Sequence, residues 1–136
     1  MSHARTQIRK KAAELLAPVA PVHCTRVLPI EQASLPVLLV STATEEIEGQ
    51  FGVLDRRLEL IVEAVTATQP VDDALDALIV EIESALTGDL EGLVASCNPA
   101  SIEVSASDEG NTLMGRARVI FSVVYRTAYA DPETSV

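Results

Sequence analysis

The sequence has 136 residues with a formal charge of −10, and 48% of its residues are hydrophobic whereas only 3% are aromatic. This length predicts a single domain, and so high an apolar content excludes intrinsic disorder. The acidic balance argues against general nucleic-acid binding, which needs clustered lysine and arginine, and the shortage of aromatic residues argues against surfaces that stack bases.

The charge is unevenly distributed along the chain. Residues 1–26 hold five bases and one acid, whereas residues 27–136 hold five bases and nineteen acids. A basic segment on an acidic body offers complementary surfaces for a partner or for a second copy. The simpler explanation, which the sequence favours, is charge for solubility with a locally basic helix.

Neither secretion nor membrane insertion is indicated by the sequence. It has no run of eighteen apolar residues, so we expect no transmembrane helix, and its basic start lacks the apolar segment of a signal peptide. Cys24 and Cys97 are the two cysteines, and without a secretion signal we expect both to be reduced. These features fit a cytoplasmic setting.

The first half of the sequence predicts one helix followed by three extended segments. Apolar residues recur on one face of a helix over 3–17, which a proline ends. Residues 24–29 predict a short edge strand, and the continuous apolar run at 35–41 predicts a strand covered on both faces. The glutamates and glycines of 43–54 predict a flexible acidic loop, and the alternation at 55–67 predicts a strand in preference to a helix.

The second half predicts a helix and two strands. A regular apolar stripe indicates a helix over 70–87, and alternation indicates a strand at 101–107. Residues 108–111 are typical of a turn, and 113–127 form the clearest long strand. We expect residues 128–136 to be a flexible C-terminal tail.

This order of elements predicts an α+β fold made of one domain, residues 1–127. We expect a two-layer sandwich in which two helices cover one face of a mixed, mostly antiparallel sheet of four to five strands. Ile120 and Val124 on the last strand, like Ile61 and Val65, face away from the helices. Such an apolar outer face indicates either self-association or shielding by the chain's own loops, and the sequence favours neither.

No constellation of residues in the sequence predicts catalysis. His23 and Cys24 are neighbours whose side chains point to opposite faces of a strand, so the imidazole cannot activate the thiol. Asp72 and Asp76 lie one helical turn apart, but carboxylates at a helix start are explained by the helix dipole. We therefore expect no enzyme, no metal site and no cofactor.

Several segments nevertheless follow one another in a distinctive order. They are the basic helix 8–12, then RVLP at 26–29, LPVLLV at 35–40, RRLELIVE at 56–63, DDALDAL at 72–78, residues 81–86, and 115–127 with its Tyr-Arg-Thr ending. In this order, over nearly the whole chain, the sequence resembles the tail terminator (minor tail protein U-like) family of long-tailed bacteriophages and their prophage remnants.

The resemblance implies a structural protein of virion assembly. Members of this family form a hexameric ring that caps the growing tail tube, stops its polymerisation and presents the surface that joins the head. The implied partners are further copies of the chain, the tail tube protein and a head–tail connector protein, with DNA at most passing through the ring. The implied location is the bacterial cytoplasm during assembly and then the virion tail.

We expect the contacts with other subunits or partners to involve the acidic loop, the start of the next strand and the outer face of the last strand. These residues are Glu45, Glu46, Glu48, Phe51, Arg56, Arg57, Ile120 and Val124. Charge reversal of both arginines should therefore weaken assembly more than folding. The alternatives are another head–tail connector or tail-completion protein, or a small α+β ligand-binding domain or enzyme.

Overall fold

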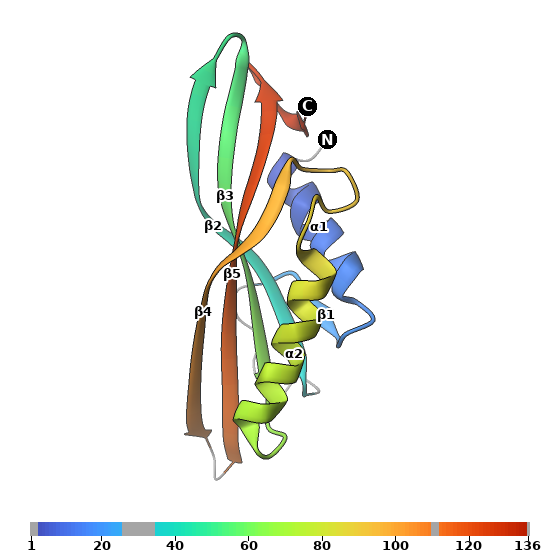
Figure 1. Cartoon of the computed structure of the whole chain (residues 1–136), viewed down its shortest axis with the longest axis vertical. Coiled ribbons are helices and arrows are strands. Elements are labelled where there is room, and N and C mark those ends of the chain that lie inside the picture. The colour runs from blue at the N-terminus through green and yellow to red at the C-terminus, as the bar shows by residue number, and fades with distance from the viewer. Residues whose placement is uncertain (1–2, 26–34, 110–111, 136) are drawn as a thin grey trace.

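The computed structural model describes residues 3–25, 35–109 and 112–135. Within these ranges the chain forms two helices and six strands (Figure 1). In chain order they are α1 (Ala4–Leu16), β1 (Val22–His23), β2 (Val37–Gln50), β3 (Val53–Thr66), α2 (Val71–Leu86), β4 (Ser96–Glu109), β5 (Thr112–Ala128) and β6 (Asp131–Ser135).

The strands form one sheet in the order β1-β2-β3-β5-β4, and β6 pairs with β5 outside this path. Only the two-residue pairing of β1 with β2 is parallel among the described pairs. The long central pair, β3 with β5, runs from Val53 opposite Ala128 to Thr66 opposite Gly115. The predicted α+β class with a mostly antiparallel sheet is confirmed, but six described strands replace the expected four to five.

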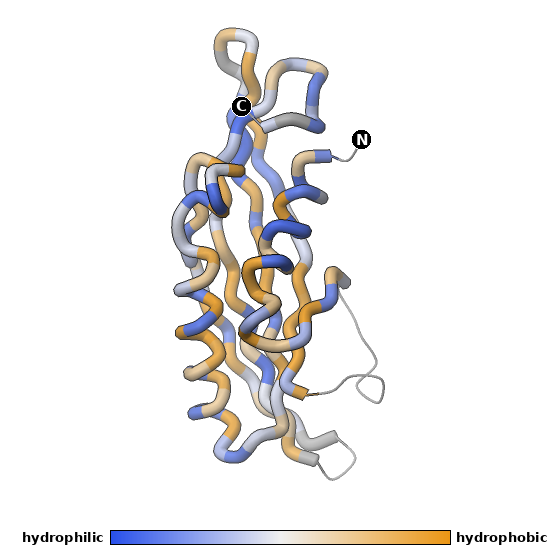
Figure 2. Tube along the Cα trace, turned by 90° about the vertical axis from the view of Figure 1, so that its right-hand side faces the viewer, coloured by the Kyte–Doolittle hydropathy of each residue, from blue (hydrophilic) through white to orange (hydrophobic). Residues whose placement is uncertain are grey.

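Both helices lie against the same face of this sheet (Figure 1), which we call the inner face. Each helix turns one apolar stripe toward the strands, and Figure 2 shows the resulting alternation of hydrophobic and hydrophilic residues along both helices. The stripes of the two helices, with the inner-face residues of the strands, form one hydrophobic core. The predicted helices are confirmed to within a residue or two, with His3 and Pro70 as their N-terminal caps.

The predicted flexible loop at 43–54 is wrong, because these residues form a β-hairpin. β2 continues to Gln50 and β3 begins at Val53, so the turn is Phe51-Gly52, with φ of 50° and 82°. A β-bulge between Thr42 and Glu45 resets the alternation along β2. The polar composition indicated a loop because the tip of this hairpin extends beyond the helices (Figure 1), so residues 46–49 are exposed on both faces of the sheet.

Three other predicted boundaries are corrected. The strand expected at 24–29 is β1, at 22–23, and residues 26–29 lie outside the described part of the chain. β4 begins at Ser96 rather than at 101. The expected flexible tail contains β6, which pairs with β5 beyond the point where β4 begins, so Thr127 lies opposite Ser135. Backbone groups of β5 that β4 does not reach are satisfied in this way.

The opposite, outer face of the sheet differs between its two ends. Val37, Val65 and Met114 form a small second cluster on it, with Leu35 packed against them. Further along, Ile120 and Val124 are only partly buried. Shielding within the chain therefore explains the outward Val65, whereas Ile120 and Val124 keep part of their surface available for contacts with other molecules.

Candidate functional site

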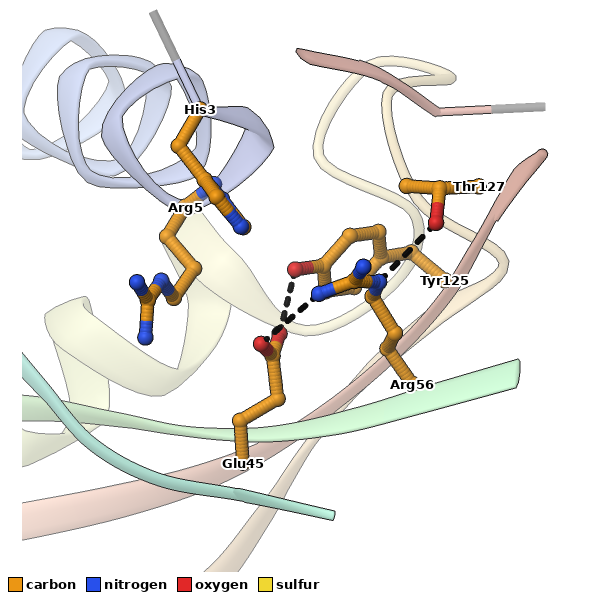
Figure 3. A network of polar contacts seen from close by, with 6 residues as sticks. All are labelled: His3, Arg5, Glu45, Arg56, Tyr125 and Thr127. Atoms are coloured by element: carbon orange, nitrogen blue, oxygen red, sulfur yellow. Dashed lines mark hydrogen bonds and ion pairs between the residues drawn. The ribbon is translucent and has the colours of Figure 1, made fainter. Parts of the chain in front are cut away.

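The eight residues expected to make contacts fall into three separate places. Glu45 and Arg56 lie on the inner face, under the start of α1 (Figure 3). Phe51 forms the tip of the β2–β3 hairpin. The remaining five are on the outer face of β2, β3 and β5: Glu46, Glu48, Arg57, Ile120 and Val124.

Glu45 and Arg56 are the centre of a buried polar network (Figure 3). Arg56 Nη1 lies 3.2 Å from Glu45 Oε2, and Arg56 Nε donates a hydrogen bond of 2.9 Å to Thr127 Oγ1. The hydroxyl of Tyr125 donates to the second carboxylate oxygen of Glu45. One side chain from β2, one from β3 and two from β5 are thus joined beneath α1.

This network is a structural device and not an exposed contact surface. The side chains of Glu45 and Arg56 are 5% and 8% exposed, and no buried side-chain polar atom lacks a partner among the described residues. A buried ion pair needs such full hydrogen bonding to offset the loss of its hydration. Burial, and then the hydrogen bond to Glu45, raise the pKa of Tyr125 above its usual range.

Sequence reasoning grouped Arg56 with Arg57, but neighbours on a strand point to opposite faces. Arg57 lies on the outer face, between Glu46 of β2 and Val124 of β5 in the strand register. Among the described residues, no carboxylate lies within ion-pair distance of the Arg57 guanidinium. The inward orientation of Glu45 was missed for a different reason, because the bulge that turns this residue inward has no signature in the sequence.

The outer-face residues surround a shallow groove at the hairpin end of the sheet. Its volume is about 350 Å³, and its lining includes Glu46, Glu48, Arg57 and Val124. A second groove of about 330 Å³ adjoins it toward Ile120. The wider outer face is crossed by ion pairs between neighbouring strands, such as Glu63 with Arg116 at 2.9 Å. Such a surface is polar but has apolar spots, as protein–protein contact surfaces do.

Two exposed aromatic side chains lie at this end of the sheet, and sequence reasoning named only the first, Phe51 at the hairpin tip. Phe51 is 94% exposed and adopts a positive φ, which is unfavourable for a bulky residue. Tyr129, in the turn between β5 and β6, is also exposed, and its backbone N–H donates to Gly52 O at 3.2 Å. The Tyr129 hydroxyl lies over Gly49, where a Cβ would approach it to 2.9 Å.

The described residues contain no cluster of three or more histidine, cysteine or acidic side chains with metal-binding geometry. Cys24 and Cys97 are both free, and burial raises the pKa of the Cys97 thiol to about 12. No helix in the described part of the chain is long and apolar enough to cross a membrane.

Comparison with known proteins gives a likeness of fold. The chain is similar to a chain in the solved structure of the virion of a native gene transfer agent particle, with a TM-score of 0.55 and 13% sequence identity. The similarity covers 92% of this chain and 92% of that chain. No protein-family model matches the sequence, and no match was found among curated proteins.

Proposed function

We propose that the protein is a structural component of virion assembly that caps a phage-type tail tube as a homohexameric ring. In this role it ends tail polymerisation and offers the surface that joins the head, without catalytic turnover. It acts in the bacterial cytoplasm during assembly and then remains in the virion tail. Its partners are its own copies, the tail tube protein and a head–tail connector protein.

One observation carries the proposal: the fold of nearly the whole chain is shared with a chain of a virion particle. The likeness covers 92% of each chain, as expected when most of the subunit, rather than a small motif, serves the assembly. The ordered segments that resemble tail terminators point the same way. They include the end of β5, where Tyr125 and Thr127 complete the buried network.

The arrangement of the molecule suits a ring subunit. A rigid two-helix core anchors a long β-hairpin that extends beyond the helices (Figure 1), and the buried network fixes the base of that hairpin. The outer-face groove and the exposed Phe51 then lie at the end of the sheet that this network joins to the core. Many modest contacts of this kind, repeated around a ring, produce strong binding to a tube end through avidity.

Light scattering over rising protein concentration, with negative-stain images of the same samples, tests the proposal. We expect sixfold rings, and Arg57→Glu should shift their formation to higher concentration while leaving the melting temperature unchanged. Lys10→Glu, a charge reversal on the exposed side of α1, is the matched control and should form rings as the wild type does.

Two results would contradict the proposal. One is a protein that stays monomeric at all concentrations and also leaves the length of assembling tail tubes unchanged. The other is an assembly whose symmetry differs from that of a tube end. A connector or completion protein would bind assembled heads or finished tails but would not limit tube length, so tube length separates the two readings.

A further inference from the structure

The two long edges of the sheet are each covered over one part and open over the rest. At the β2 edge, β1 pairs with Leu38 and Leu39 only, and residues 46–49 are exposed. At the β4 edge, Gly88 N donates to Cys97 O at 2.9 Å, whereas residues 101–106 are exposed. In the described part of the chain no further strand pairs with 45–50 of β2 or with 101–107 of β4.

An open edge presents unpaired backbone N–H and C=O groups, and proteins usually protect such an edge with lysine, proline or a covering segment. Residues 101–107 contain neither lysine nor proline, and Glu103 is their single charged residue. Their exposed side chains include Ile102 and Val104, at 43% and 50% exposure. This stretch has β-forming composition and lacks the usual protection, so it is suited to pairing with another strand.

We infer that residues 101–107 of β4 in one copy pair with residues 45–50 of β2 in the next copy, so that the sheet continues from subunit to subunit. This inference rests on the proposed ring, in which identical subunits must each offer two different surfaces. It adds the identity of those surfaces and the geometry of their contact.

The direction of the strands supports this pairing. Each neighbouring pair along the path β2-β3-β5-β4 is antiparallel, so β2 and β4 of one subunit run in opposite directions. In two copies of the same orientation, β4 of the first therefore meets β2 of the second in antiparallel fashion. Because Ser101 lies level with Ser41 in the register across the sheet, the second copy must be displaced along the strands for its residues 45–50 to reach 101–107, and the strands then lie oblique to the ring axis. Antiparallel pairing forms the stronger hydrogen-bond ladder, and the inner faces of both sheets stay on one side.

The side chains of the two edges also match face to face. On the inner face, Ile102 and Val104 lie opposite core residues of β5, and Ile47 of β2 lies opposite Arg56. Ile47 is itself 53% exposed. In a register with Glu46 and Glu48 opposite Ser107 and Ser105, Ile47 lies opposite Ala106 and diagonal to Val104, so continuation of the sheet would bring Ile47 and Val104 together.

The outer faces of the two edges can meet without contact between like charges. There β2 offers Glu46 and Glu48, and β4 offers the uncharged Ser105 and Ser107. A register that sets these pairs against each other keeps the glutamates away from Glu103 and near Arg116, one strand further in. The inner face would thus supply apolar contact while the outer face avoids like-charge repulsion.

Chemical cross-linking tests the contact directly. Ile47→Cys and Val104→Cys are made as separate proteins, both carrying Cys24→Ser to remove the exposed thiol, and are treated with a short bismaleimide. We expect a cross-linked dimer in the mixture and none in either variant alone. The double variant Ile102→Lys with Val104→Lys should lose self-association, whereas Val80→Lys, at an exposed position on α2, should keep it.

The outcomes separate this inference from the proposed function. Self-linking of Val104→Cys would overturn it in favour of a twofold β4–β4 contact, and rings without the mixed cross-link would overturn it while leaving the ring. Absence of both association and mixed cross-link at millimolar concentration would also overturn it. A mixed cross-link in open filaments that never cap a tube would keep the edge pairing and refute the ring cap.

Discussion

Replacing Arg56 should destabilise the fold strongly, whereas replacing the adjacent Arg57 should leave its stability almost unchanged. Arg56→Ala removes the guanidinium that lies 3.2 Å from Glu45 and donates to Thr127. The Glu45 carboxylate then stays buried, with the Tyr125 hydroxyl as its remaining hydrogen-bond donor in the network. Removing one partner of a buried ion pair costs about 3–5 kcal/mol, whereas an exposed surface substitution usually changes stability by less than about 0.5 kcal/mol.

This loss is large compared with the total stability of a domain, which is about 5–15 kcal/mol. At roughly 3–4 °C per kcal/mol for a chain of this size, Arg56→Ala should lower the melting temperature by about 10 °C or more. Arg57→Ala, on the exposed outer face, should melt within about 2 °C of the wild type. Thermal unfolding followed by circular dichroism measures the melting temperatures of both variants.

A double-mutant cycle isolates the pair itself. Glu45→Leu combined with Arg56→Leu removes both charges, so the double variant should be more stable than the sum of the single changes implies, by about 0.5–3 kcal/mol. Equal melting of Arg56→Ala and Arg57→Ala, or strict additivity in the cycle, would refute the buried network. It would also restore the expectation that both arginines serve assembly.

Three further changes test other parts of the structure. The raised pKa of Tyr125 means that its ionisation favours the unfolded state, so the free energy of unfolding should fall as pH rises above about 10. In Tyr125→Phe the urea midpoint of unfolding should fall less over the same pH range. Burial lowers the pKa of His3, so α1 should lose protection from amide exchange as pH drops below about 6.5, and His3→Asn should remove that dependence. Gly115→Ala should cost about 1–3 kcal/mol, because its Cβ would lie 2.9 Å from Val71 Cβ; Gly49→Ala, facing a movable hydroxyl, should cost less in thermal melts.

The periodicity of apolar residues predicted the elements that pack one side against the hydrophobic core. Both helices and the strand β5, expected at 113–127 and observed at Thr112–Ala128, were found because each has one side in the core, which leaves a regular stripe in the sequence. The α+β class follows from their order. The resemblance of the ordered segments added the proposed function, which periodicity alone does not indicate.

The errors concern features that the sequence does not encode locally. The bulge after Thr42 is set by pairing with β3, a contact that a one-dimensional pattern cannot show. The tail became β6 because β5 extends past the beginning of β4 and leaves backbone groups for it to pair with. Glu45 and Arg56 seemed to be surface charges because a buried ion pair and an exposed one have the same residue types.

The distribution of charge in the folded chain argues against electrostatic attraction as the force that joins copies. Lys11, Arg56, Arg116, Arg118 and Arg126 each already pair with a carboxylate of the same chain. Subunits that each carry a formal charge of −10 therefore repel one another over most of their surface, and a contact at one arginine cannot offset this.

In the proposed ring, association would then rest on backbone pairing and apolar contact, which gives salt a predictable effect. Because added salt screens the repulsion and leaves backbone hydrogen bonds largely unaffected, the concentration at which copies associate should fall as ionic strength rises. Sedimentation velocity across a series of sodium chloride concentrations measures this directly. If association weakened with salt instead, attraction between the basic first helix and the acidic body would be the joining force, and the edge pairing would lose its physical basis.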